Sequence, residues 1–172
     1  LPKYMCMKDE WKEKLQYHTH FYMDLNWRKQ YVGVLEMEYD GIKFYFIDNE
    51  YYFNGYAPYG DMYADIEKFA FFSKAVLSAL PLIDFRPDII HCHDWQTGLV
   101  PIYLDNFRYG NEFYRGIKTV MTIHNLKFQG TWDPKRVRDI TGLPQYYFAP
   151  DKLEAYKDAN YLKGGIVYAD RV

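Results

Sequence analysis

The chain has 172 residues and a mass of 20.7 kDa, and its 21 Lys and Arg residues against 23 Asp and Glu give a formal net charge of −2. This length suits about one domain, and the balanced charge excludes the clustered cations that nucleic-acid binding needs. Charged residues interrupt every apolar run well before a bilayer-spanning length, which excludes a membrane span. The two cysteines, Cys6 and Cys92, predict no disulfide framework and indicate a reducing compartment.

The N-terminal third predicts a β-hairpin between two irregular segments. Residues 8–30 are polar with scattered aromatic side chains, and we interpret them as an irregular or partly helical segment. The β-branched and aromatic runs 32–39 and 42–47 flank Asp40-Gly41, which is typical of a two-residue hairpin turn because type I′ turns need positive φ. Residues 49–60 are rich in Tyr, Asn, Gly and Pro and predict a loop.

A long amphipathic helix is predicted from Asp61 to Asp84, with Asp61 as its N-terminal cap. Its predicted buried face consists of Ile66, Phe69, Ala70, Ser73, Val76, Leu77 and Leu80. The apolar runs 89–92 and 117–123 predict strands that are buried on both faces.

Further helices are predicted at 97–107, 134–141 and 160–169. The alternation of helices and strands is typical of a parallel sheet with helices on its faces. The predicted fold class is therefore α/β: a Rossmann-like, mostly parallel sheet with flanking helices, plus the β-hairpin.

The ends of the chain indicate a piece of a longer protein. It begins Leu1-Pro2-Lys3-Tyr4 without an initiator Met, and the last predicted helix runs into an incomplete strand at Arg171-Val172. A lone terminal strand would leave backbone groups unpaired. The alternative is a tail that pairs at the edge of the sheet.

Polar clusters lie at the ends of the two predicted buried strands, at His91 to Gln96 and at Thr122 to Asn125. Ligands of open α/β sheets bind outside the carboxyl ends of the strands, and the ends of neighbouring strands lie about 5–10 Å apart. An ionised Asp94 offers acceptor oxygens to adjacent sugar hydroxyls, and a neutral His124 offers one donor and one acceptor. Trp95 offers a flat apolar face to a sugar ring. We therefore expect Asp94 and His124 to face one crevice.

Each of these residues also has a structural interpretation. Asp94 suits the N-cap of the following helix, and His124 suits a loop histidine bonded to backbone. His91 and His93 project to one face of a strand, as a zinc-binding pair would, which leaves a metal-dependent hydrolase as a rival hypothesis. No third ligand follows at a metal-site spacing, so a structural role with His91 buried in the sheet is favoured. Lys163-Gly164-Gly165 lies inside a helical pattern and predicts close helix packing, not a phosphate-binding loop.

Taken together, these motifs resemble one enzyme family. Pro87-Asp88-Ile89-Ile90-His91-Cys92-His93-Asp94-Trp95-Gln96-Thr97-Gly98-Leu99 resembles the HDWQ segment of bacterial glycogen synthases and plant starch synthases. Thr122-Ile123-His124-Asn125-Leu126 through Gln129-Gly130 resembles their THN…QG segment. Other stretches resemble further family segments in the same order: Leu1 to Tyr4, Tyr59-Gly60, Asp65 to Ser73, and Leu162 to Asp170. At Ile66-Glu67-Lys68 the chain departs from the Asn-Glu-Arg that is common in the family.

The resemblance implies part of a retaining glucosyltransferase with the two-domain GT-B fold. Such an enzyme transfers glucose from an ADP-glucose donor to the non-reducing end of an α-1,4-glucan acceptor, glycogen or starch. Residues 1–172 would form an incomplete N-terminal Rossmann-like domain. The first strand with its glycine loop, and the C-terminal nucleotide-binding domain, would be absent, so that the chain alone is expected to be inactive.

The resemblance also implies roles for particular residues. The catalytic residues would be His124 and Asp94, and the substrate-binding residues would be Tyr59, Asn125, Trp95 and Gln96. No cofactor or metal is implied, and no nucleic acid or membrane is an expected partner. We expect a cytoplasmic location, in a bacterium more than in a plastid. The residues present do not themselves distinguish ADP from UDP.

A second hypothesis is a non-catalytic glucan-binding module, motivated by the aromatic fraction of 20%. Flat rings pack well against the apolar faces of sugars, although an aromatic surplus more often fills cores and loops. Glucan binding without any effect of Asp94 or His124 on catalysis would favour this hypothesis.

Overall fold

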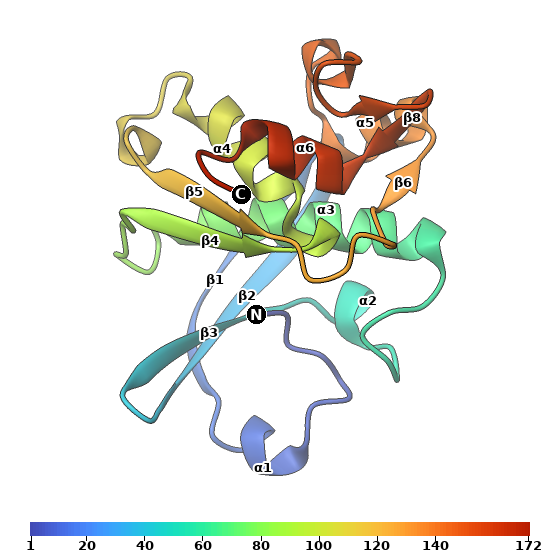
Figure 1. Ribbon diagram of the computed structural model, residues 1–172. Coiled ribbons are helices and arrows are strands. Elements are labelled where there is room, and N and C mark those ends of the chain that lie inside the picture. Colours follow the sequence, from blue (N-terminus) through green and yellow to red (C-terminus); the bar gives the residue numbers. More distant parts are fainter.

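The computed structural model describes residues 1–172 as a set of helices with three small β-sheets (Figure 1). The α-helices are α1 (Asp9–Lys12), α2 (Glu50–Phe53), α3 (Met62–Ala79), α4 (Leu99–Arg108), α5 (Pro134–Thr141) and α6 (Tyr161–Tyr168). The strands are β1 (Gln16–Leu25), β2 (Arg28–Tyr39), β3 (Ile42–Asp48), β4 (Ile89–His93), β5 (Lys118–Thr122), β6 (Thr131–Trp132), β7 (Glu154–Ala155) and β8 (Asp158–Asn160). Short 3₁₀ helices lie in three connections: η1 (Trp95–Thr97), η2 (Glu112–Tyr114) and η3 (Gln145–Phe148).

The strands β1, β2 and β3 form an antiparallel sheet in that order. The hairpin predicted between β2 and β3 is confirmed, because Asp40 and Gly41 occupy its turn with φ of 51° and 73°. The irregular or partly helical segment predicted at residues 8–30 is wrong: it contains only the short α1, and most of it forms β1 and the start of β2. Buried Met23 and Leu25 alternate with exposed polar neighbours there, and this period of two is the signature of a half-buried strand.

The parallel part of the fold is the pair β4 and β5, in a register that joins Ile89 to Lys118 and His93 to Thr122. Beyond β5, Val120 forms an isolated parallel bridge with Arg171. The predicted burial of both faces is wrong for β4, since Ile89 is 59% exposed and His91 is exposed rather than buried in the sheet. The exposed residues Ile89, His91 and His93 share one face of β4, whereas Cys92 on the other face is buried, so the fold covers only one face of this strand.

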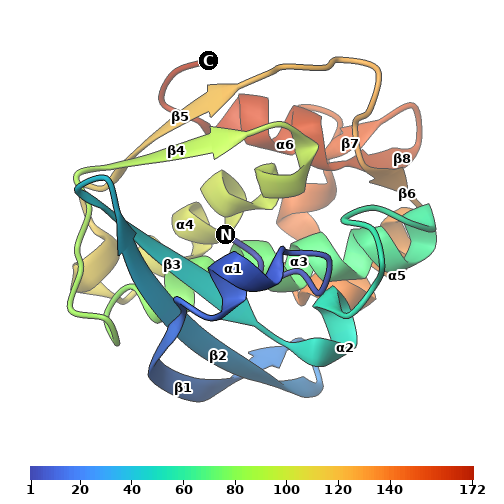
Figure 2. The same cartoon turned by 90° about the horizontal axis from the view of Figure 1, so that it is seen from below.

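Helix α3 lies at the centre of the molecule, with the hairpin sheet and the β4–β5 pair on different sides of it (Figure 2). It ends at Ala79, before the predicted Asp84, because Pro81 cannot continue a helix. The side chain of Asp61 makes no capping hydrogen bond. Instead the carboxylate of Asp65 accepts a hydrogen bond from the backbone of Gly60 at 3.0 Å. The apolar residues of α3 belong to one continuous cluster of 34 buried residues, so the chain has a single hydrophobic core.

The other helices lie close to their predicted positions. Helix α5 has the predicted bounds, whereas α4 starts two residues later than expected because η1 precedes it. The predicted helix at 160–169 is α6, with Asn160 as its cap. The predicted loop 49–60 contains the one-turn helix α2, whose cap is Asn49.

Glycines allow α6 to pack closely against the start of α4. A Cβ on Gly164 would lie 2.5 Å from the side chain of Ile102, and a Cβ on Gly98 would collide with the backbone carbonyl of Tyr161. The prediction that Gly164 and Gly165 serve helix packing is therefore confirmed.

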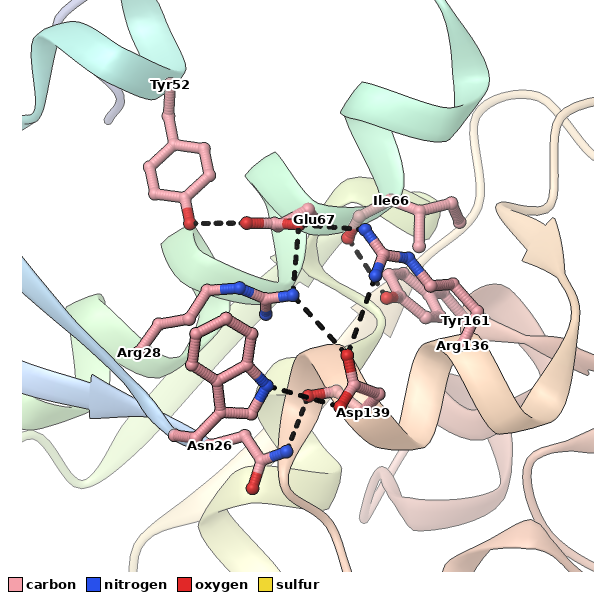
Figure 3. A network of polar contacts seen from close by, with 9 residues as sticks. Asn26, Arg28, Tyr52, Ile66, Glu67, Arg136, Asp139 and Tyr161 are labelled. Carbon is pink, nitrogen blue, oxygen red and sulfur yellow. Dashed lines mark hydrogen bonds and ion pairs between the residues drawn. The ribbon is translucent and has the colours of Figure 1, made fainter.

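A polar network ties the hairpin sheet to α3 and α5 (Figure 3). The Glu67 carboxylate lies 3.9 Å from a guanidinium nitrogen of Arg28 and 3.6 Å from one of Arg136, and it accepts a hydrogen bond from the hydroxyl of Tyr52 at 3.0 Å. Asp139 lies 3.5 Å from the guanidinium nitrogens of both arginines. Because Arg28 and Glu67 are mostly buried, this network fixes how the β1–β2 turn sits on the helices.

Candidate active site

The carboxylate of Asp94 joins the ends of β4 and β5. Its Oδ1 accepts hydrogen bonds from the backbone N–H groups of His124, at 2.7 Å, and Asn125, at 3.2 Å. The backbone N–H of Asp94 in turn donates to the carbonyl of Thr122 at 2.9 Å. Asp94 stands at the N-cap position of η1, but its side chain makes no capping bond there. The N-cap interpretation of its carboxylate is therefore wrong.

The backbone of Asp94 is strained. Its φ of 56° and ψ of −173° lie in a region that is essentially reserved for glycine. Such strain costs about 1–3 kcal/mol and is concentrated at functional sites, where the surroundings over-determine the conformation. Thr97 helps to fix this backbone conformation, because its hydroxyl donates a hydrogen bond to the carbonyl of His93 at 2.8 Å. The strained turn directs the carboxylate away from its own helix and across to the neighbouring strand end.

Three histidines lie along this edge. The rings of His91 and His93 are 4.2 Å apart between centroids, which confirms that they share one face of β4. Nδ1 of His93 lies 3.1 Å from Nε2 of His124, and the two rings are stacked at 23°. Partial burial and the neighbouring imidazoles lower the pKa of His93 below its usual 6.5. His93 is therefore neutral at pH 7. The side chain of His124 contacts this imidazole and not the backbone, so the interpretation of His124 as a loop histidine bonded to backbone is wrong.

An open groove of about 490 Å³ lies beside this edge, between β4, α3 and the N-terminal segment of the chain. Its lining includes three of the predicted site residues, Tyr59, Asp94 and Gln96. Tyr59 is 58% exposed and its ring lies 6.1 Å from that of Phe69. His124 and Asn125 do not line the groove, but they are exposed and are held next to it through Asp94. A polar rim on a mostly apolar groove is a common form of small-molecule site.

Trp95 lies elsewhere than predicted. Its indole is 3% exposed, with its ring edge-on to that of Phe69 at 5.0 Å and against the backbone of Gly130. A sugar ring has no access to that indole, so the predicted flat face is used in the core. Packing fixes the residue that directly follows the strained Asp94.

The structure thus brings Asp94, His124, Asn125, Tyr59 and Gln96 to one region and withdraws Trp95 from it. Sequence reasoning missed His93 as a partner of His124, because it placed His93 in the polar cluster before Asp94 but assigned it a role only as a metal ligand. Its position directly before Asp94, at the end of a strand, was the signal that it shares the crevice. Nothing in the sequence pointed to the carboxylate–amide bonds of Asp94.

The geometry offers no metal centre, because no group of three or more His, Cys, Asp or Glu side chains is arranged to hold a metal ion. His91 instead uses its Nε2 in a 2.7 Å contact with the hydroxyl of Thr122. None of the helices is both long and apolar enough to cross a bilayer.

Comparison with known proteins shows the family to which the chain belongs. Residues 1–172, the whole chain, match the family described as the starch synthase catalytic domain. The chain belongs to that family. It is similar to glycogen synthases from Lachnoclostridium phytofermentans, with 70% identity over 172 residues, and from Lachnospira eligens, with 69%. Each alignment covers 100% of this chain and 36% of the relative, so the chain spans about a third of their length.

Among solved structures, the chain is similar to the catalytic domain of starch synthase IV from Arabidopsis thaliana bound to ADP and acarbose. The TM-score is 0.81 at 26% sequence identity, and the match covers 99% of this chain and 36% of that one. The family resemblance inferred from the motifs and the predicted α/β class, as part of a GT-B fold, are therefore confirmed.

Proposed function

We propose that this chain is part of a glycogen synthase, a retaining glucosyltransferase that moves glucose from ADP-glucose to the non-reducing end of an α-1,4-glucan. The observation that carries the proposal is the Asp94 clamp, the pair of bonds from its carboxylate to the amides of His124 and Asn125. It lies beside a groove of about 490 Å³ in a chain that matches the family from end to end. A cytoplasmic bacterial enzyme fits this proposal, and the relatives named above are bacterial.

Residues 1–172 would then form an incomplete N-terminal Rossmann-like domain. The groove supports this, because it runs along the edge of β4 that lacks a paired strand, and Leu1, Pro2 and Tyr4 line its other side. A strand supplied by sequence that precedes this chain in the whole enzyme would pair with that edge of β4 and occupy the apolar part of the groove. Its glycine loop would border the polar end of the groove, at Asp94 and Gln96, where the sugar would bind. A second domain would carry the nucleotide site, so the 172-residue chain alone would have no transferase activity.

The residues of this chain would position the transferred glucose. Nε2 of His124 faces His93, which leaves Nδ1 to meet a sugar hydroxyl. Oδ1 of Asp94 is occupied by two backbone amides, which leaves Oδ2 as the free acceptor. Tyr59, Gln96 and Asn125 would complete the contacts at the rim of the groove. Breaking the glucose–phosphate bond separates charge, and preorganised groups in a closed cleft stabilise that separation.

The test is incorporation of labelled glucose from ADP-glucose into glycogen by the full-length enzyme that contains this chain. His124→Ala should lower turnover about tenfold to a thousandfold, the range for loss of a positioned polar group. His18→Ala is the matched control: His18 lies 2.7 Å from Glu36 in the hairpin sheet, outside the groove, and its loss should leave turnover unchanged. Unchanged turnover in a well-folded His124→Ala enzyme would remove His124 from the site. Incorporation by the isolated 172-residue chain would contradict the domain assignment.

A further inference from the structure

The outer face of the hairpin sheet carries a strip of exposed rings. Tyr22 and Tyr31 are cross-strand partners, His20 lies two residues before Tyr22 on the same face, and Tyr17 follows beyond an irregularity in the register. We call Tyr17, His20, Tyr22 and Tyr31 the aromatic strip. Tyr17, Tyr22 and Tyr31 are 62%, 61% and 38% exposed, and none of the four residues lines the groove of the candidate active site.

The strip is ordered by its own contacts. The ring of Tyr31 is stacked on that of His20 at 5.7 Å between centroids and meets Tyr22 edge-on at 5.8 Å. The Tyr17 hydroxyl lies 2.6 Å from Nδ1 of His20. Gly33 makes this arrangement possible, because a Cβ there would come within 3.0 Å of the Tyr31 hydroxyl. A glycine in the middle of a strand weakens the sheet, and here its effect is to let the Tyr31 ring lie down over the strand.

The chemistry of the strip fits a carbohydrate better than a protein. Each of its four side chains combines a flat ring with a hydrogen-bonding oxygen or nitrogen, and none is aliphatic. The rim continues the pattern with polar groups, since the next cross-strand pair on this face is Asp24 and Lys29. Protein-docking patches are also rich in tyrosine, but their cores are depleted of charged residues, whereas this strip runs directly into the Asp24–Lys29 pair. Sugar rings instead need apolar C–H contacts and hydroxyl partners side by side.

The far end of the same face is partly covered. Trp11 of α1 packs edge-on against Tyr39 at 5.1 Å, at the far end of β2. The strip is the part that this N-terminal segment leaves open, and from Tyr17 to Tyr22 it extends about 16 Å along the strand. That length accommodates more than one sugar ring and therefore suits a chain rather than a monosaccharide.

We propose that the aromatic strip binds an α-1,4-glucan chain at a second carbohydrate site, separate from the groove. The proposal rests on the proposed function for the identity of the glucan. The strip would hold a branch of the polymer while another chain end is extended, so it should matter for glycogen and not for acceptors too short to reach both sites.

The experiment uses the full-length enzyme and the double variant Tyr22→Thr/Tyr31→Thr, because threonine keeps the strand propensity while it removes both rings. Affinity gel electrophoresis in glycogen should show binding weakened about tenfold, from the loss of two ring contacts. The KM for glycogen should rise by a similar factor, whereas kcat and the KM for maltotriose stay unchanged. Tyr22→Phe/Tyr31→Phe keeps the rings and should stay within about threefold of the parent enzyme.

Tyr109→Thr is the matched control, since Tyr109 is 78% exposed at the end of α4 and should leave all values unchanged. Thermal unfolding of each variant checks folding. Glycogen affinity of the threonine variant equal to that of the parent would overturn the proposal. So would a variant that binds glycogen normally but elutes as a different oligomer, which would assign the strip to a second copy of the chain. Absence of any glucosyl transfer in the parent enzyme would overturn the proposed function while the binding result still decided the strip.

Discussion

Substitution of Asp94 separates its two physical roles, the strained backbone and the clamp on the next strand end. Asp94→Ala removes the clamp and leaves a side chain at a φ of 56° and ψ of −173°. Asp94→Gly removes the clamp but adopts that conformation without strain. Asp94→Asn keeps an acceptor oxygen for the amides of His124 and Asn125 and tolerates positive φ better than alanine does.

The magnitudes follow from the contacts. A hydrogen bond to a charged group contributes about 1.5–3 kcal/mol, and partial exposure of Asp94 brings the clamp to about 2 kcal/mol for both bonds. Asp94→Ala should therefore lower the free energy of unfolding by about 2 kcal/mol. In Asp94→Gly, relief of about 1–3 kcal/mol of strain offsets that loss, so its stability should stay within about 1 kcal/mol of the parent. Asp94→Asn should lose about 1 kcal/mol.

Activity should follow a different order. Without the clamp His124 is free to move, and a misplacement of about 1 Å can cost about a hundredfold in rate. Asp94→Gly should thus be nearly as stable as the parent but as inactive as Asp94→Ala. Asp94→Asn keeps the clamp but has an amide NH2 in place of the Oδ2 acceptor, so its turnover should lie between those of Asp94→Ala and the parent. Urea unfolding of the chain and glucosyl transfer by the full-length enzyme measure the two quantities. Equal destabilisation by glycine and alanine would refute the strain argument. A stable but inactive Asp94→Asn would refute the clamp, because the charge itself would then be required.

Three further predictions concern stability, and urea unfolding of the chain measures each of them. Gly98→Ala should cost about 1–3 kcal/mol, because its methyl group would collide with the carbonyl of Tyr161, whereas Gly60→Ala meets nothing within 4 Å and should be neutral. Glu67→Gln should cost about 2 kcal/mol, because it removes the more buried of the two carboxylates that Arg28 and Arg136 share and leaves them only Asp139. Glu112→Gln in an exposed pair should change stability by less than about 0.5 kcal/mol, and equal effects would refute the argument. The hydrogen bond from Lys118 lowers the pKa of Asp170, so its contribution is present above the unfolded-state pKa of about 3.9 and is lost as the pH falls through the lower folded-state pKa. Between pH 7 and pH 2.5, the parent should therefore lose more stability than Asp170→Asn, and identical losses would contradict this.

Local sequence patterns predicted the structure correctly where the turn residues, helix caps or hydrophobic spacing of a segment fitted only one kind of element. The hairpin at Asp40-Gly41, the bounds of α5 and the glycines of α6 follow from turn chemistry, caps and spacing. The strand β1 was missed because its outward residues are polar and aromatic, so its alternation resembles an irregular segment. The exposure of β4 was missed because an apolar run does not reveal how many strands or helices surround it.

In the site, the positions of the strand ends predict which residues lie close together, but the bonds between those residues are visible only in the structure. Parallel strands bring their carboxyl ends together whatever the side chains are, and this placed Asp94 beside His124. Which atoms meet depends on a backbone conformation that no propensity favours for aspartate. The φ of 56° at Asp94 turns the carboxylate toward the amides of the next loop, and burial of the following Trp95 holds that turn in place. Trp95 therefore supports the site from the core and does not contact a sugar, because its packing beside Asp94 is what allows the strained backbone of Asp94 to persist.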